Sequence, residues 1–379
     1  MLPDLGHLCG GGVLTVLVAA GTIGMPVDTH SLLEESRGVS YQSHGGVHRG
    51  VLGWHGEQMD TGLVFALRHR LAWIVPHRTV LHAFAALCLL ASALGAGPRQ
   101  VSAAGTVIQV VASTNVYADV VAQLGGGHVR VIGILSNPNA DPHSYESSTV
   151  DAAAVARATL VVRNGLGYDD FVGKLEDASP NPRRVTIDVG ATLGYRTGDN
   201  PHLWYKLDTM ARLAPLIVAA LGRQDPADRS AFRANLSTFT ASLRPWLSQI
   251  AAIKGRFGGT PVAVTEPVFD YAAQAAGLRI LTPAPFQAAV MGGTDPAPQD
   301  VQRQKDLFSR RAIKAFFYNQ QAVAPITVQL LDLARRYHVP VVGVYETKPS
   351  HRTYQQWMVA EMDAVGLALS RGVSTEQIR

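Results

Sequence analysis

Two loops of the chain contain the residues best suited to binding a metal ion. They read D-P-H at 141–143 and N-P-H at 200–202, so a proline directly precedes a histidine in both. The proline restricts the backbone and thereby aims the imidazole. Because neutral imidazole is the commonest protein ligand for metals, we predict that His143 and His202 bind a metal ion. His128, which directly precedes a predicted strand, is interpreted as an ordinary structural residue.

Two carboxylates could complete such a site. Glu266 follows the apolar run 262–265, and Glu346 follows the apolar run 341–345. Ligands of parallel α/β sheets bind beyond the carboxyl ends of the strands, so both side chains are candidate oxygen ligands. The alternative is that either carboxylate caps the helix that follows it.

Strands and helices alternate after residue 104, in two series. The predicted strands are 107–112, 129–134, 160–162 and 185–189, and then 261–265, 279–282, 312–318 and 339–345. The predicted helices are 116–124, 150–157, 169–177, 269–276, 299–309, 326–338 and 354–371. This alternation is typical of parallel sheets covered on both faces, so we predict an α/β protein with two (β/α) lobes.

A segment with helical periodicity separates the two series. Its apolar residues recur every three or four positions and are Phe232, Leu236, Phe239, Leu243, Trp246, Ile250 and Ile253. We predict one long connecting helix at about 226–257, on the order of 45 Å long. Pro245 lies inside this stripe and should kink the helix or divide it.

The first hundred residues differ from the rest. Residues 83–94 form a short apolar run, preceded by arginines and followed by small residues, which is typical of a secretory signal peptide. We therefore predict a signal peptide region at 68–104. Residues 1–67 are interpreted as an upstream extension whose place in the natural protein is doubtful. The protein is expected to be exported and extracytoplasmic, in the cell envelope or periplasm, either cleaved or held at the membrane by an uncleaved signal. Cys88 lies within the apolar run, which argues against a lipid anchor there.

The remaining sequence is divided into an N-terminal metal-binding lobe at 105–224, a connecting helix at 225–258 and a C-terminal metal-binding lobe at 259–379. Both cysteines lie before residue 104, which excludes a disulfide scaffold and a thiolate zinc site in these parts. The net charge is +4 and the basic residues are scattered, so nucleic acid is not an expected partner.

Residues 107–371 resemble the metal-receptor family of ABC importers, the solute-binding proteins that capture zinc, manganese or iron outside the membrane. The resemblance is carried by NADPHSYE around His143, NPHLW around His202, TEPVFDYAAQAAGL around Glu266, VVGVYET around Glu346, DPAPQDV at 295–301 and TYQQWMVAEMDAVGLAL at 353–369. It implies two lobes joined by one long helix and four ligands that meet between the lobes. By position these ligands are His143, His202, Glu266 and Glu346.

The resemblance also implies a function. The chain is expected to capture Mn²⁺ or Zn²⁺ between its lobes as transported cargo and to deliver it to an ABC importer permease, acting as a monomer. Two imidazoles with two carboxylates favour manganese slightly, although zinc has the higher intrinsic affinity for such ligands. The chain is not expected to be an enzyme. Two alternatives stay open: a metal-dependent hydrolase, because His143 and Glu146 form an H-x-x-E pair, and a metal-stabilised surface adhesin.

Overall fold

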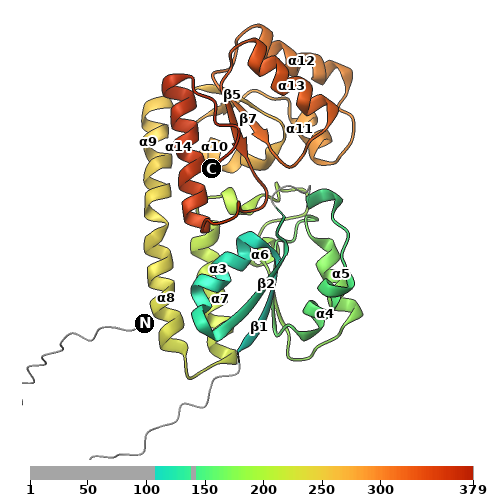
Figure 1. Ribbon diagram of the computed structural model, residues 1–379, viewed down its shortest axis with the longest axis vertical. Helices are drawn as coiled ribbons and strands as arrows, with labels where there is room; N and C mark the ends of the chain where they lie inside the picture. Colours follow the sequence, from blue (N-terminus) through green and yellow to red (C-terminus); the bar gives the residue numbers. More distant parts are fainter. Residues whose placement is uncertain (1–106, 138–141, 379) are drawn as a thin grey trace, which may run out of the picture. The chain divides into compact units, whose positions relative to one another are not determined.

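The computed structural model describes residues 107–137 and 142–378, without the side chain of His143 (Figure 1). The predicted upstream extension at 1–67 and the signal peptide region at 68–104, with Cys88, lie outside the described residues.

The first lobe is built on a four-stranded parallel sheet in the order β2-β1-β3-β4. Its strands are β1 (Ile108–Thr114), β2 (Val129–Leu135), β3 (Leu160–Arg163) and β4 (Val185–Asp188). Successive side chains of a strand point to opposite faces, so Val110 packs into one buried cluster and Val111 into another. The helices on the two faces are α3 (Asn115–Gly125) and α7 (Thr209–Gln224) on one, and α4 (Thr149–Arg157) and α5 (Asp170–Ala178) on the other.

The second lobe repeats this arrangement with the strand order β6-β5-β7-β8, again all parallel. Its strands are β5 (Pro261–Val264), β6 (Arg279–Ile280), β7 (Phe316–Asn319) and β8 (Val341–Val344). One face packs against α11 (Ala284–Met291), α12 (Pro298–Ser309) and α13 (Pro325–Arg336). The other face packs against α10 (Asp270–Ala275) and α14 (Tyr354–Arg371). Two parallel-sheet lobes confirm the fold class predicted from the sequence.

Two consecutive helices connect the lobes. They are α8 (Arg229–Ser242), which packs against α3 and α7, and α9 (Arg244–Phe257), which packs against α10 and α14. Only Leu243 separates them, and Pro245 occupies the first turn of α9, where its missing N–H costs no hydrogen bond. The proline therefore divides the predicted connecting helix, one of the two outcomes expected from the sequence.

Other differences from the predicted elements have local causes. The predicted strand 312–318 begins only at Phe316, because the residues after α12 form a turn in which Arg311 has a positive φ of 50°. Helix α7 was not predicted, and it continues through Pro215 in its interior. The helices α6 (Val189–Leu193) and α11 were also not predicted.

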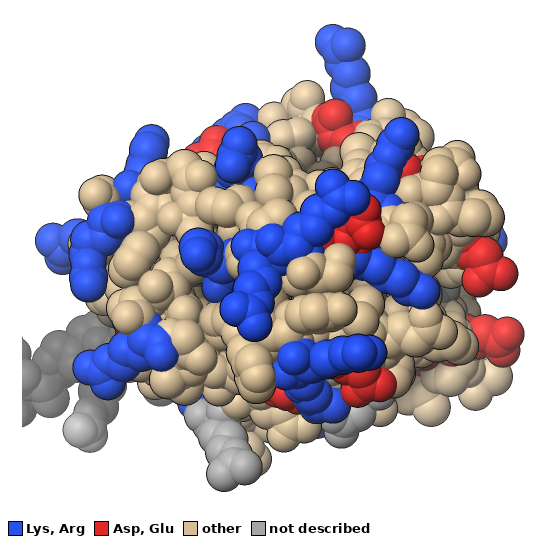
Figure 2. Space-filling view, turned by 90° about the horizontal axis from the view of Figure 1, so that it is seen from above, with Lys and Arg blue, Asp and Glu red and all other residues tan. Residues whose placement is uncertain are grey.

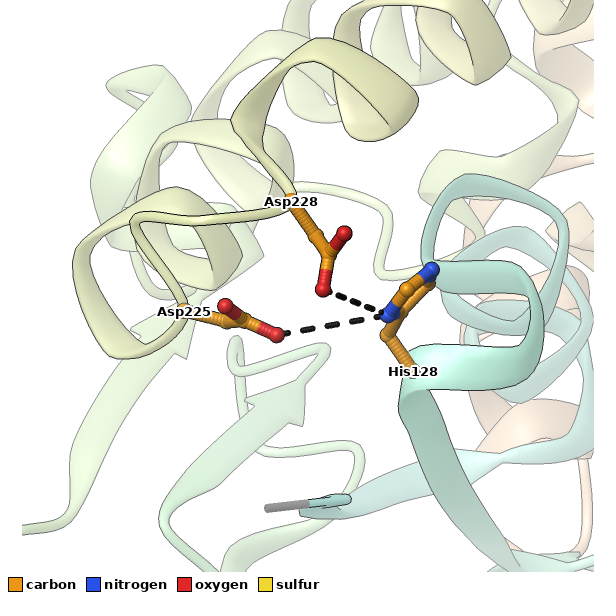
Figure 3. Close-up of side chains that lie close together, drawn as sticks. All are labelled: His128, Asp225 and Asp228. Carbon is orange, nitrogen blue, oxygen red and sulfur yellow. Dashed lines mark ion pairs between the residues drawn. The ribbon is translucent and has the colours of Figure 1, made fainter. Parts of the chain in front are cut away.

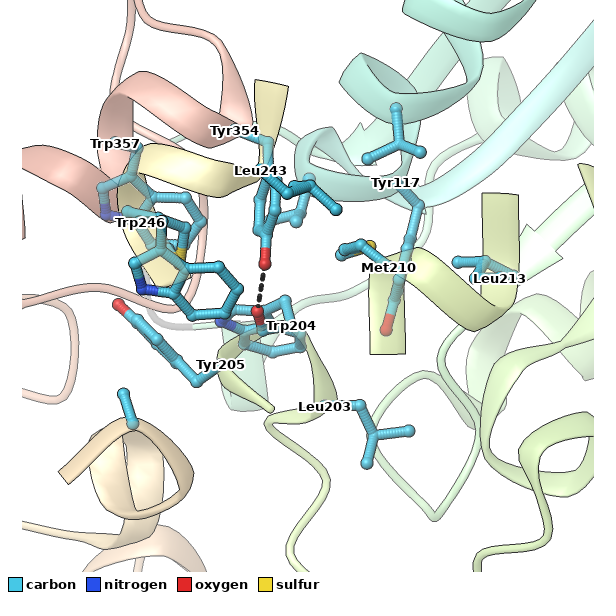
Figure 4. Packing of buried hydrophobic residues seen from close by; sticks show 14 of the residues in the cluster. Tyr117, Leu203, Trp204, Tyr205, Met210, Leu213, Leu243, Trp246, Tyr354 and Trp357 are labelled. Carbon is cyan, nitrogen blue, oxygen red and sulfur yellow. Dashed lines mark hydrogen bonds between the residues drawn. The ribbon is translucent and has the colours of Figure 1, made fainter. Parts of the chain in front are cut away.

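The apolar core continues from one lobe into the other through a group of buried aromatic side chains (Figure 4). Trp204 and Tyr205 belong to the short helix η3 (Leu203–Tyr205) of the first lobe. Tyr354 and Trp357 belong to α14, and the Tyr354 hydroxyl donates to the Trp204 carbonyl at 2.6 Å. The rings of Tyr205 and Trp357 lie 5.5 Å apart, edge to face, while Trp246 of α9 packs on Tyr354. The lobes are therefore joined by close packing as well as by helices.

On the face of the molecule seen in Figure 2, Lys and Arg side chains cover more of the surface than Asp and Glu side chains do. Three helices carry basic residues in their last turns. These residues are Lys254 and Arg256 in α9, Arg335 and Arg336 in α13, and Arg371 in α14. A helix C-terminus carries partial negative charge, so these side chains stabilise the helix ends. Within the described residues, no helix combines the length and apolarity of a bilayer span.

The buried Glu361 yields a prediction about stability. Its Oε1 is 2.8 Å from both the Tyr205 hydroxyl and the Trp357 Nε1, and burial raises its pKa well above the ordinary value of 4.5. The folded protein thus holds a proton that the unfolded chain releases near pH 4.5. The free energy of unfolding should fall as pH rises from that value through the folded pKa.

We expect Glu361→Gln, which keeps an oxygen at this position and removes the titration, to unfold with a weaker dependence on pH. Urea denaturation of both proteins between pH 5 and pH 9 measures the difference. Parallel pH profiles for the two proteins would show that Glu361 does not carry this proton.

Candidate metal centre

His202 lies on the loop between α6 and η3, directly before η3. The Asn200 Oδ1 is 2.7 Å from its Nδ1 and also accepts from the His202 backbone N–H at 3.0 Å. The Asn200 Nδ2 donates to the Pro267 carbonyl at 2.6 Å, which fixes the orientation of the amide. Because the amide oxygen must face Nδ1, the proton of the neutral ring is assigned to Nδ1 and the Nε2 lone pair is the one available for ligation.

Asn164, which directly follows β3, binds the loop that carries His202. The Asn164 Nδ2 donates to the Pro201 carbonyl at 2.9 Å, and the Tyr117 hydroxyl donates to the Asn164 Oδ1 at 2.6 Å. The Asp169 carboxylate accepts from the Asn164 N–H, and burial raises the pKa of Asp169 to about 6. These contacts hold the backbone directly before His202.

Glu266 and Glu346 lie at the carboxyl ends of neighbouring strands of the second sheet. Glu266 comes two residues after β5 and Glu346 two residues after β8, while Asn319 ends β7, the strand between them. The Asn319 Nδ2 is 2.7 Å from an oxygen of each carboxylate. All three residues are at most 1% exposed. The sheet order thus brings both predicted oxygen ligands to one amide.

Gln321 supports the backbone of Glu346. Its Oε1 accepts from the backbone N–H groups of Glu346 and Thr347 at 2.7 and 2.9 Å. The backbone N–H of Gln321 donates to the Asn319 Oδ1 at 2.9 Å. The Asn319 side chain is therefore oriented by Gln321, while its amide nitrogen contacts Glu266 and Glu346.

The two lobes meet at Glu346. Its Oε2 lies 3.5 Å from the His202 Nε2, and both side chains are fully buried. The Tyr168 hydroxyl, also from the first lobe, donates to the same oxygen at 3.1 Å. Burial and the neighbouring Glu346 raise the pKa of Tyr168 well above its ordinary value, so the phenol stays a neutral donor.

This geometry suits a cation. A neutral Nε2 and a carboxylate oxygen both present lone pairs, and they lie 3.5 Å apart on two fully buried side chains. The rings of Tyr168 and Trp204 lie 6.0 and 5.4 Å from the imidazole, edge to face, and keep the surroundings apolar. In such surroundings a positive ion between the two groups is favoured strongly.

The structure thus brings three of the four sequence-predicted residues to one place. His202 contacts Glu346 directly, and Glu266 joins Glu346 through Asn319. The backbone of His143 belongs to the short helix η2 (Pro142–Ser144), but its side chain lies outside the described part, so its role stays a prediction.

Sequence reasoning missed Asn319 and Tyr168. Asn319 directly follows a predicted strand, so the strand-end rule that indicated Glu266 and Glu346 could have found it. Tyr168 follows a turn in which Gly165, Leu166 and Gly167 all have positive φ, and no periodic signal marks it.

Comparisons with known proteins agree with this architecture. Residues 110–366 match the family described as zinc-uptake complex component A, periplasmic. The manganese-binding lipoprotein MntA of Bacillus subtilis is 27% identical over 229 residues, which are 55% of this chain and 70% of that protein.

Solved structures share the fold. FpvC from Pseudomonas aeruginosa, in complex with Mn²⁺, has a TM-score of 0.57 and 20% identity, over 69% of this chain and 98% of that chain. The periplasmic zinc-binding protein TroA from Treponema pallidum has a TM-score of 0.59 and 18% identity, over 69% and 99% of the two chains.

Asn319 permits a test of how the carboxylates are held. We expect Asn319→Ala to lower the free energy of unfolding of the metal-free protein by about 2–3 kcal/mol, because two buried carboxylate oxygens lose their donor. Asn235→Ala is the control, since it removes a single hydrogen bond to the Leu124 carbonyl. Chemical denaturation measures both, and equal losses would show that the bridging amide has no special role.

Proposed function

The chain belongs to the family of the periplasmic zinc-uptake complex component A, and on that premise we propose that it captures a divalent metal ion between its two lobes and delivers it to the permease of an ABC importer. The observation that carries this proposal is the pair formed by the His202 Nε2 and the Glu346 Oε2, 3.5 Å apart and fully buried, with one member from each lobe. An ion bound by both would bridge the lobes.

The ligand set that we propose is His202, Glu266, Glu346 and His143. Two imidazole nitrogens and two carboxylates together form a donor set that accepts both manganese and zinc. The carboxylates can each bind through one oxygen or two, which suits manganese, whereas zinc has the higher intrinsic affinity. The names of the family and of a relative include both metals, so we propose that the physiological ion is manganese or zinc.

Burial supports capture instead of catalysis. A catalytic metal needs an open position for water or substrate. The described ligands His202, Glu266 and Glu346 are at most 1% exposed, and a Tyr168 hydroxyl covers one of the carboxylate oxygens. A site closed by protein on these sides favours a receptor over a hydrolase.

The setting of the protein follows from the same proposal. We propose that the protein works outside the cytoplasm, where it meets the ion, and that it docks on the permease as a monomer. The ion is transported cargo and is released there.

Removal of His202 tests the binding site. We expect His202→Ala to weaken the tightest binding of Mn²⁺ and Zn²⁺ by about 100-fold or more, because a direct ligand contributes at least as much as the groups that orient it. Isothermal titration of the metal-free chain, with metal analysis of the recovered protein, measures the change.

His338→Asn is the matched control for that experiment. His338 is exposed and has a φ of 59°, a conformation that asparagine tolerates. The His338→Asn protein should bind both metals with the same affinity as the unmodified chain. Unchanged binding by His202→Ala would refute the proposed site, whereas lost binding with normal metal uptake by cells would refute delivery to the importer.

A further inference from the structure

We propose a second divalent-metal site in the first lobe, formed by His128, Asp225 and Asp228 (Figure 3). His128 ends the short helix η1 (Gly126–His128), directly before β2. Asp225 directly follows α7, and Asp228 directly precedes α8. Among the residues that the structure describes, these three form a group of ligand atoms that all lie within 4.8 Å of one another.

The spacing of the ligand atoms suits a metal ion. The His128 Nδ1 lies 3.0 Å from the Asp228 Oδ2 and 4.0 Å from the Asp225 Oδ2. Ligands about 2.0–2.2 Å from a tetrahedral zinc are about 3.4 Å from each other, a value between those two distances. Figure 3 shows both carboxylates directed at the same ring nitrogen. Small side-chain adjustments would bring all three atoms into one coordination shell.

Asp225 supplies an independent indication of a ligand. Its side chain is 11% exposed, and none of the described residues donates a hydrogen bond to its carboxylate, which approaches the His128 Nδ1 at 4.0 Å. A carboxylate that loses its water without gaining donors is costly to bury. A bound cation removes that cost.

The Asp228 side chain does not cap the helix that follows it. An aspartate directly before a helix normally accepts a hydrogen bond from the backbone of the first turn. The Asp228 side chain makes no such bond to α8 and instead faces His128. With a neutral imidazole the group carries two negative charges, so a divalent cation balances it.

The ligand types define the class of ion. One imidazole and two carboxylates are typical of zinc and its transition-metal neighbours. The side chains of His128 and Asp228 are 35% and 34% exposed, so the ion is reached from solvent and can keep water ligands. The ring of Phe232 packs edge to face on His128 at 5.5 Å and holds it in place.

This second site is distinct from the proposed cargo site. It lies at the amino end of β2, whereas His202 and Glu346 lie beyond the carboxyl ends of the strands, and β2 alone spans roughly 20 Å. A metal here would tie the start of α8, the first connecting helix, to the turn before β2.

Zinc titration of the metal-free chain tests the proposal. With His202→Ala as background, we expect zinc to bind still, more weakly than cargo, and to raise the melting temperature. Adding His128→Gln or Asp225→Asn to that background should weaken this binding by at least about tenfold and abolish the rise. The NMR signal of the His128 Nδ1 should shift on zinc addition to the His202→Ala protein.

Asp208→Asn is the matched control, because Asp208 also directly precedes a helix but pairs with the exposed Arg212. It should leave zinc binding unchanged. Equal zinc binding by the His202→Ala protein with and without His128→Gln would overturn the second site. The proposed cargo site fails separately, if His202→Ala alone leaves the tightest binding intact.

Discussion

The amide nitrogen of Asn319 lies between two buried carboxylates, and the proposed metal centre depends on that contact. Glu266 and Glu346 follow strands that flank β7, and two buried carboxyl groups in one place need a hydrogen-bond donor between them. The parallel sheet supplies the solution, because its strand order places an amide at the end of the central strand. The Tyr168 hydroxyl adds a second donor from the opposite lobe.

Residues of both lobes also determine the orientation of the His202 ring. Asn200 orients the His202 ring, and the Asn200 amide is itself oriented by the Pro267 carbonyl of the second lobe. The Tyr271 hydroxyl donates to the Asn200 carbonyl from the same side. Contact between the lobes and the tautomer of the imidazole are therefore coupled, since separation of the lobes would release the amide that faces the His202 Nδ1.

The sequence predicted the framework of the protein because its signals are local. Apolar runs identified the strands, the helical stripe identified the connection, and Pro245 predicted that this connection is kinked or divided. The strand-end rule also indicated Glu266 and Glu346, and the repeated proline–histidine loops indicated His202.

What the sequence did not predict depends on tertiary contacts. Asn319 stands at a strand end that the sequence could have indicated, but its contacts with two carboxylates become visible only when the sheet places it between them. Asp225 and Asp228 are ordinary helix-end residues until the fold brings His128 to them across the lobe. The interpretation of His128 as merely structural came from its place before a strand, which contains no information about those partners.

The aromatic packing between η3 and α14 also governs how the protein should unfold. Separate domains of a chain commonly melt in separate steps, each with its own heat absorption. Here one continuous apolar core contains residues of both sheets, so loss of either lobe would expose the rings of the other. The described part of the chain should therefore melt in a single cooperative transition. A captured ion would then stabilise both lobes together, and its binding energy would be spread over the entire fold.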